Sequence, residues 1–457
     1  MRFASWSVVL TAALISTYAL EHEASACGAC IGEVNTVVTD HRMVLSISQD
    51  QSTLYDQIRY TGNPASFAWV LPIKGTVQVG LSSDVVFQTL DQFTTTRIRP
   101  PSLNCAGPKN TCPPQPAEAG VALSPSEGGG VTVTKTEVVG PYETVQLKAT
   151  DANALETWLT MNGFTIPASV KPVIDTYVSE KFDFLAMKLL PNQGVSSMRP
   201  VRVTTPGANA VLPLRMVAAG TGATVGITLW VIGEGRYEPQ NFPTFFISGD
   251  EITWDWTQNK SNYVTLRAQK TAASGGRGWE LENATTLAGQ QIESYAMSPG
   301  GAADDYLPVT DAQGTTVKTP VEARTEDFST LLHGVTMPRI TRLRADLAHA
   351  ALDADLVMTA STDQSEVPTF RQATLESAEP SCPIYDGCTV VGNAPRSQAA
   401  VQSKASDSAG PSGSSGGCVL GNADTSPLAG LAGAGGFLAV ALVRARRRRR
   451  QQVLNNR

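Results

Sequence analysis

Short runs of β-branched and aromatic residues, bounded by Gly, Pro, Asn and Asp, dominate the chain between about residues 34 and 370. Residues 224–232 alternate apolar with small or polar positions, which is typical of a strand with one buried face. Similar runs predict strands at Phe67–Ile73, 131–139, Tyr142–Leu147, 182–189, 245–247 and 263–266. The pattern therefore predicts a high sheet content.

Three segments show helical spacing instead. Asp151 can cap a helix with an apolar face, and Asn162-Gly163 can end it with a left-handed residue. Ser83 precedes a second amphipathic segment, and residues 342–354 form a third. We expect an α+β fold that is β-rich, with antiparallel sheets and a few short amphipathic helices. The chain shows no internal repeat of 20 to 50 residues, which argues against a solenoid or a propeller.

The N-terminus has the pattern of an export signal. Arg2 precedes an apolar run over residues 3–20, and Ala24-Ser25-Ala26 supplies the small residues that signal peptidase accepts. We expect residues 1–26 to be a signal peptide that is cut between Ala26 and Cys27. An uncleaved N-terminal anchor and lipidation of Cys27 stay open as alternatives.

The C-terminus has the pattern of a membrane anchor. Residues 395–417 are rich in Ser, Gly and Ala, which predicts an unfolded stalk. Residues 428–443 carry no charge and predict one C-terminal transmembrane helix, although about 24 Å of helix is shorter than a bilayer core of about 30 Å. Snorkelling arginines and local thinning can make up the difference. The alternative is a flexible Ala/Gly tail with a basic end.

The charge distribution agrees with this topology. The net charge is -6, and seven arginines lie among the last fourteen residues, so subtracting them leaves -13 for residues 1–443. The positive-inside rule places the Arg-rich tail, residues 444–457, in the cytoplasm and the acidic body outside. An acidic body repels phosphates, so we expect no nucleic-acid partner. The expected partners are the membrane, an envelope-processing machinery that acts on the tail, and an unidentified surface partner.

The end of the chain resembles the myxobacterial C-terminal sorting tail, called MYXO-CTERM. Its Gly-Cys motif, hydrophobic helix and arginine cluster match Gly417-Cys418, residues 428–443 and the cluster that begins at Arg444. Many members carry a second Cys shortly after the first, where this chain has Val419-Leu420. The resemblance implies processing at Cys418 and anchoring at the cell surface.

The body resembles the bacterial domain-of-unknown-function family 2330, whose members begin with a Cys-Gly motif at the mature N-terminus. The matching sequences are Cys27-Gly28 and those at residues 67–72, 158–164, 177–189, 213–215, 340–344 and 355–357. This resemblance implies secretion and supplies no established activity. The resulting domain order is a signal peptide (1–26), a β-rich extracytoplasmic domain (27–375), a Cys-containing segment with a Ser/Gly-rich stalk (376–427), the transmembrane helix and the cytoplasmic tail.

The seven cysteines fall into three close pairs and one single residue, Cys418. The pairs are Cys27 with Cys30, Cys105 with Cys112, and Cys382 with Cys388. In an exported chain, close pairs favour short local disulfides. The Cys27-Gly28-Ala29-Cys30 motif can also be a redox pair or half of a zinc site, but no following helix or further ligands are visible nearby.

Candidate chemistry is sparse in the body. Beyond the signal peptide, His41, His333 and His349 show no metal-ligand spacing, and no nucleophile elbow, phosphate loop or calcium loop occurs. Residues 275–278 are a Gly-rich turn, and Asp304-Asp305 are solvated carboxylates or, alternatively, calcium ligands. We expect no cofactor and no metal.

Trp254 and Trp256 flank Asp255, so a strand would place both indoles on one face. They predict either core packing or a ligand platform. The leading hypothesis is an exported envelope protein, anchored at the cell surface and not an enzyme, with a structural, adhesive or binding role. The alternatives are a secreted enzyme whose site is assembled only in the fold, and a ligand-binding or sensory module.

Overall fold

The computed structural model describes residues 31–32, 37–61, 67–109, 137–148, 152–161, 170–190, 198–218, 221–297, 306–310 and 315–405. The chain divides into two compact units, residues 1–405 and 406–457. All described residues belong to the first unit.

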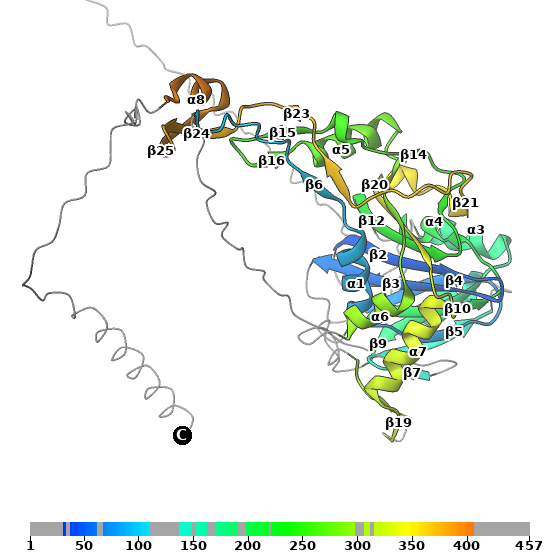
Figure 1. The fold of residues 1–457 in the computed structure, drawn as a ribbon. Coiled ribbons are helices and arrows are strands. Elements are labelled where there is room, and N and C mark those ends of the chain that lie inside the picture. Colours follow the sequence, from blue (N-terminus) through cyan, green and yellow to red (C-terminus); the bar gives the residue numbers. More distant parts are fainter. Residues whose placement is uncertain are drawn as a thin grey trace, which may run out of the picture. The chain divides into compact units, whose positions relative to one another are not determined.

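The largest sheet of this unit has eight strands in the order β14-β17-β20-β12-β2-β3-β10-β5 (Figure 1). Their bounds are β2 Val37–Ile47, β3 Gln51–Thr61, β5 Gln78–Leu81, β10 Val201–Pro206, β12 Thr221–Gly233, β14 Thr244–Phe245, β17 Trp279–Thr286 and β20 Arg339–Ala348. β12 pairs parallel with β2, β14 pairs parallel with β17, and the other neighbours are antiparallel. The sheet is therefore mixed, not purely antiparallel as the sequence predicted.

A second, fully antiparallel sheet has five strands in the order β1-β4-β9-β8-β7. The strands are β1 Ile31–Gly32, β4 Phe67–Ile73, β7 Glu137–Val139, β8 Tyr142–Leu147 and β9 Asp183–Leu189. The main core joins residues of both sheets, including Met43 and Leu45 from β2, Trp69 and Leu71 from β4, and Met187 from β9. The predicted strands at residues 67–73, 142–147 and 182–189 are confirmed.

Helices cover the other face of each sheet. On the large sheet, α1 (Asp84–Thr94), α6 (Gly289–Ala296) and α7 (Pro320–Leu332) contribute to a second core that includes Val44 and Trp230. On the small sheet, α2 (Ala152–Met161), α3 (Lys171–Ser179) and α4 (Leu214–Ala218) pack on Val70 and Phe184. β12 is consequently buried on both faces over residues 225–233, whereas its alternation predicted only one buried face.

The first two predicted helices are confirmed. The Ser83 hydroxyl caps α1 by accepting a hydrogen bond of 3.2 Å from the backbone N–H of Val85. The helix predicted after Asp151 is α2, while Asp151 and Asn162-Gly163 themselves lie outside the described residues.

Two predictions of element type are wrong. Residues 339–348 form β20 and not the predicted helix. The prediction failed because Leu343 and Leu347 are four positions apart, a spacing that places them on one face of a strand as well as on one face of a helix. The run at 263–266 begins helix α5 (Tyr263–Ala273) and is not a strand. A short apolar run alone does not distinguish the two types.

The folded part continues beyond the predicted domain end. β24 (Ser381–Asp386) and β25 (Thr389–Pro395) form a hairpin, and α8 (Arg396–Gln402) packs against it. The stalk predicted from residue 395 is therefore wrong for residues 395–402. Among the described residues, no helix has both the length and the apolar character to cross a membrane; the predicted span at 428–443 lies outside them.

Short strands complete the unit. One three-stranded sheet consists of β11 (Val211–Leu212), β21 (Leu356–Ala360) and β13 (Tyr237–Pro239). Another consists of β16 (Lys260–Ser261), β15 (Thr253–Asp255) and β23 (Leu375–Glu376). Pairs are formed by β6 (Arg97–Arg99) with β22 (Phe370–Gln372), and β18 (Val309–Thr310) with β19 (Thr316–Lys318).

One disulfide joins distant parts of the chain. Cys105 is bonded to Cys382, with a sequence separation of 277 residues and a Cα–Cα distance of 5.5 Å. Cys388 is also in a disulfide, and its partner is not Cys382. The predicted local pairings of Cys105 with Cys112 and of Cys382 with Cys388 are therefore wrong. The spacing of cysteines in the sequence carried no information about the long-range approach of β24 to the segment after β6.

Candidate functional site

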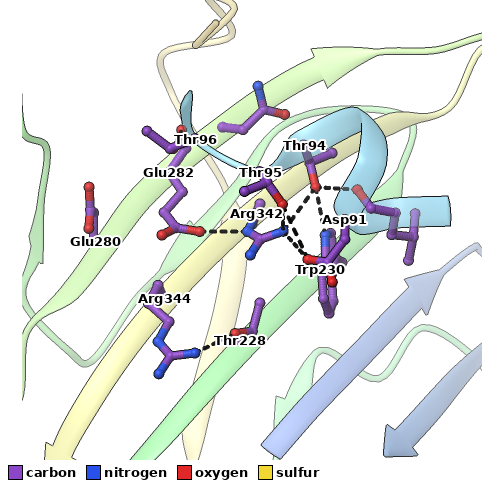
Figure 2. Close-up of polar contacts among 12 residues, drawn as sticks. Asp91, Thr94, Thr95, Thr96, Thr228, Trp230, Glu280, Glu282, Arg342 and Arg344 are labelled. Atoms are coloured by element: carbon purple, nitrogen blue, oxygen red, sulfur yellow. Dashed lines mark hydrogen bonds and ion pairs between the residues drawn. The ribbon is translucent and has the colours of Figure 1, made fainter. Parts of the chain in front are cut away.

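A cluster of charged side chains lies on the face of the large sheet that also carries α1. In β20, Arg342 and Arg344 lie on the face opposite the core residues Leu343 and Ala345, because strand neighbours alternate. β12 contributes Thr228 and Trp230 to the same face, and β17 contributes glutamates (Figure 2). The alternation of β20 thus gives one strand an apolar face and a charged face.

Arg342 is the centre of this network. Its Nε donates to Oε2 of Glu282 at 2.5 Å, and its Nη1 donates to Oδ1 of Asp91 at 2.6 Å and to the Thr95 hydroxyl at 3.0 Å. Figure 2 shows Glu282 approaching from one side of the guanidinium and Asp91 and Thr95 from the other. The buried guanidinium is paired with two carboxylates, which offset its desolvation.

The ring of Trp230 contacts two arginines, Arg342 and Arg42. The guanidinium of Arg342 is 4.9 Å from the Trp230 ring and that of Arg42 is 5.3 Å from it, so both make cation–π contacts. Arg42 also pairs with Asp91 and donates to Oε1 of Gln57 at 2.7 Å. The indole Nε1 of Trp230 donates to the Thr94 hydroxyl at 2.8 Å. These contacts fix the C-terminal turn of α1 against the sheet.

Glu280 lies next to this network on β17. The Tyr263 hydroxyl donates to its Oε1 at 2.5 Å, and Arg371 donates to the same oxygen at 3.0 Å. Burial raises the pKa of Glu280, and the nearby charge of Glu282 raises it further. Burial and the Glu280 carboxylate likewise raise the pKa of Tyr263.

Arg371 connects the network to the later part of the chain. It comes from β22 and donates to the carbonyl oxygens of Ile247, Leu281 and Glu282 at 2.7–3.0 Å. Glu280 has no exposed surface and Arg371 is 4% exposed, so neither presents an open face to a substrate. In this arrangement, the network connects the strands β17, β20 and β22 with α1.

The space between the two sheets contains a different feature, an apolar groove. Its walls include Leu45, Leu71, Ile73 and Val203, and it has about 650 Å³ of space not filled by atoms, part of it open to solvent. Lys74 also lines it. A concave surface with these walls suits a ligand of apolar character.

A histidine and an aspartate form a buried pair near this groove. Nδ1 of His41 is 3.1 Å from Oδ1 of Asp56, and both side chains are buried. Asp56 lines a small cavity that shares Leu54, Leu71 and Pro213 with the groove. Within the described part, Nε2 of His41 has no hydrogen-bond partner. Sequence reasoning missed this pair, because it depends on the register that sets Met43 opposite Asp56.

The structure places the predicted aromatic pair in a small core. Trp254 is 8% exposed and clusters with Ile252 and Tyr263. The Trp256 ring lies edge-to-face against it at 6.1 Å, and its Nε1 donates to Glu376 at 3.1 Å. This arrangement favours core packing for Trp254 over a ligand platform.

The remaining predicted positions are dispersed. His333 has a left-handed conformation at the end of α7, and Nε2 of His349 lies 3.0 Å from the carbonyl oxygen of Ala218. Gly275 and Gly276 have positive φ angles after α5, so the predicted turn is confirmed. No group of three or more metal-ligating side chains occurs within the described ranges. The other predicted positions lie outside them: Ala26, Cys27, Cys30, Cys112, Asp304, Asp305, Gly417 and Cys418.

Comparison with known proteins gives one match. The family described as "Uncharacterized protein conserved in bacteria (DUF2330)" matches residues 22–349. No curated protein and no solved structure matches the chain.

Proposed function

The chain belongs to this uncharacterized bacterial family, and we propose that it is an exported envelope protein, anchored at the cell surface, with a structural, adhesive or binding role. The family match covers most of the folded unit and brings no activity with it. The proposal therefore depends on the chemistry of this chain.

The disulfide between Cys105 and Cys382 carries the proposal of export. Disulfides persist in oxidising compartments and are rare in the reducing cytosol. The bond joins two positions of one folded unit that lie 277 residues apart in the sequence, and Cys388 is disulfide-bonded as well. An N-terminal signal sequence before Cys27 is consistent with that chemistry.

The C-terminal sequence supports anchoring. Residues 428–443 are uncharged and are followed by a cluster of arginines, which would stay in the cytoplasm while the acidic body is outside. The similarity to the MYXO-CTERM tail makes Cys418 the expected processing position. The membrane and the processing machinery are then the partners of the tail.

The charge network supports a role without catalysis. Its arginines are paired with carboxylates or with carbonyl oxygens, and the central side chains are buried. A buried polar network of this kind makes the folded core rigid and unique. Binding of a partner would then depend on residues at the surface.

A secreted enzyme is the second candidate, and the His41–Asp56 pair favours it. A carboxylate that orients a histidine ring is the arrangement of a general base. This function would need substrate to reach Nε2 of His41, which is buried.

Localisation of the full chain in its native host tests the leading proposal. We expect the protein in the envelope fraction, and we expect protease added to intact cells to digest it. A variant without residues 1–26 is the control and should stay in the cytoplasm. Recovery of the unaltered chain mainly from the cytoplasm would refute export.

A further inference from the structure

Two exposed arginines and one aromatic ring form a patch on the β6–β22 pair. β6 runs parallel to β22, and Arg97 lies opposite Phe370. The guanidinium of Arg99 is 3.8 Å from the centre of the Phe370 ring, and that of Arg97 is 5.8 Å from it. Phe370 is 42% exposed, and both arginines are exposed. Alternation along β6 places Arg97 and Arg99 on one face, with Ile98 on the other.

The interior fixes the position of this patch. Ile98 packs into the small core that contains Trp254, and the backbone N–H of Arg97 donates to the carbonyl of Thr369 at 2.7 Å. The Thr96 hydroxyl donates to the carbonyl of Glu282 at 3.0 Å, and Thr95 contacts Arg342 (Figure 2). The buried charge network therefore holds the residues that lead directly into β6.

The two guanidiniums differ from the buried ones in their partners. Arg342 and Arg371 each have a carboxylate partner. In the part of the chain that the structure describes, the guanidinium of Arg97 donates only to Gln92 (its backbone oxygen at 3.0 Å and side-chain oxygen at 3.4 Å), and no ion pair involves Arg97 or Arg99. These two cations without an ion-pair partner lie together in a chain whose residues 1–443 have a net charge of -13. This local charge is complementary to an anionic partner.

We propose that Arg97, Arg99 and Phe370 bind an acidic polysaccharide through its carboxylate groups. Guanidinium groups bind carboxylates with two parallel hydrogen bonds, and the cation–π contact with Phe370 holds Arg99 in place before the ligand arrives. The exposed part of the ring offers apolar contact to a sugar. The proposal rests on the proposed function only in that a surface protein meets such polymers.

The charge density of the partner distinguishes an acidic polysaccharide from a nucleic acid as the ligand of this patch. Duplex DNA carries one negative charge per about 1.7 Å of its axis, which an acidic body repels strongly. A polysaccharide carries at most about one carboxylate per sugar, so two arginines can neutralise the charges that they contact. An acidic polysaccharide therefore suits the patch better than a nucleic acid.

Binding of the full chain, purified in detergent, to polygalacturonate tests the proposal. We expect binding that weakens with salt, whereas uncharged dextran and duplex DNA bind more weakly at the same ionic strength. An Arg97→Ala/Arg99→Ala variant should lose about tenfold or more in affinity, because hydrogen bonds to charged groups are removed. Phe370→Leu should weaken binding less, because both guanidiniums remain.

The control has the same change of charge at another surface. Lys148→Ala/Lys171→Ala removes two exposed cations and should bind as the unaltered chain does. Unfolding in urea checks that each variant is folded. Absence of binding, equal loss in the control, unchanged affinity of the double arginine variant, or tighter binding to DNA would each overturn the proposal. Because the assay uses purified protein, failure here leaves the localisation result untouched.

Discussion

Arg342 illustrates how a single buried cation organises this protein. It contacts Glu282 from β17 and Asp91 from α1, so one guanidinium connects a strand, a helix and its own strand β20. Removal of one partner from a buried ion pair leaves the other charge without compensation, which costs more than the pair contributes. The effect of a substitution should therefore depend on burial, not on the number of ion pairs.

We expect Arg342→Met to lower the free energy of unfolding by about 3 kcal/mol, because it leaves Glu282 and Asp91 without their central partner. The matched control is Lys171→Met, which breaks an exposed pair with Glu156 and should cost less than about 1 kcal/mol. Urea denaturation measures both. Equal losses in the two variants would contradict the structural role of the network.

Glu280 should make stability depend on pH in an unusual direction. Burial raises its pKa above the unfolded value, so the folded state favours the protonated carboxyl. Its contribution is fully present below the unfolded pKa of about 4.3 and is lost as pH rises through the folded pKa. The stability of the unaltered chain relative to Glu280→Gln should therefore fall as pH rises above the unfolded pKa of Glu280.

Glu376 provides the opposite case for the same experiment. A hydrogen bond from Arg396 lowers the pKa of Glu376, so its contribution is present above the unfolded pKa and is lost as pH falls through the folded pKa. Stability relative to Glu376→Gln should rise with pH over the acidic range. Urea denaturation at a series of pH values measures both slopes, and slopes of the same sign would contradict the assignment of causes.

At the level of elements, the sequence predicted several strands correctly, but the length of a strand was no guide, because the ten-residue β20 was predicted as a helix. β4 and β8 begin and end as predicted, and the Ser83 cap of α1 was visible in the sequence. The failure at β20 has a physical cause. The spacing of Leu343 and Leu347 fits the period of a helix and that of a strand. Only the pairing with β12 and β17 on either side makes a strand the more stable structure.

The candidate sites were less predictable than the strands, because they depend on contacts between distant residues. Arg342 meets Asp91 across 251 positions, and His41 meets Asp56 only through the register of β2 and β3. A sequence pattern can place each side chain on a face of its element. It contains no direct information about which face of another element will cover it.

The long-range disulfide gives a prediction at this level. A digest of the unreduced protein should contain a peptide that joins Cys105 to Cys382, and no peptide that joins Cys382 to Cys388. Replacing both Cys105 and Cys382 with Ala should lower the free energy of unfolding by about 2–5 kcal/mol, because a long loop is released in the unfolded chain. Recovery of the local pairs instead would contradict the described connection.

At the level of the whole molecule, the body and the C-terminal tail have opposite charge. The body is acidic and carries a disulfide across its length, while the last fourteen residues contain seven arginines. The proposal of an exported, tail-anchored chain rests on these two features, because disulfides persist in oxidising compartments and arginine clusters favour the cytoplasmic side of a membrane. The junction between them contains Cys418, which has no close neighbour among the cysteines of the sequence.

Cys418 is where we expect the anchoring reaction. If the tail acts as the sorting sequence that it resembles, processing in the native host removes residues 428–443 and leaves Cys418 at or near the new C-terminus, modified by lipid. Cys418→Ser should then keep the full tail and fail to reach the outer surface, which intact mass and protease digestion of intact cells would show. The control is Ser415→Ala in the same segment, which should be processed normally. Unchanged mass and unchanged exposure in Cys418→Ser would eliminate the sorting reaction, and would leave a short tail anchor held in the membrane by its arginines.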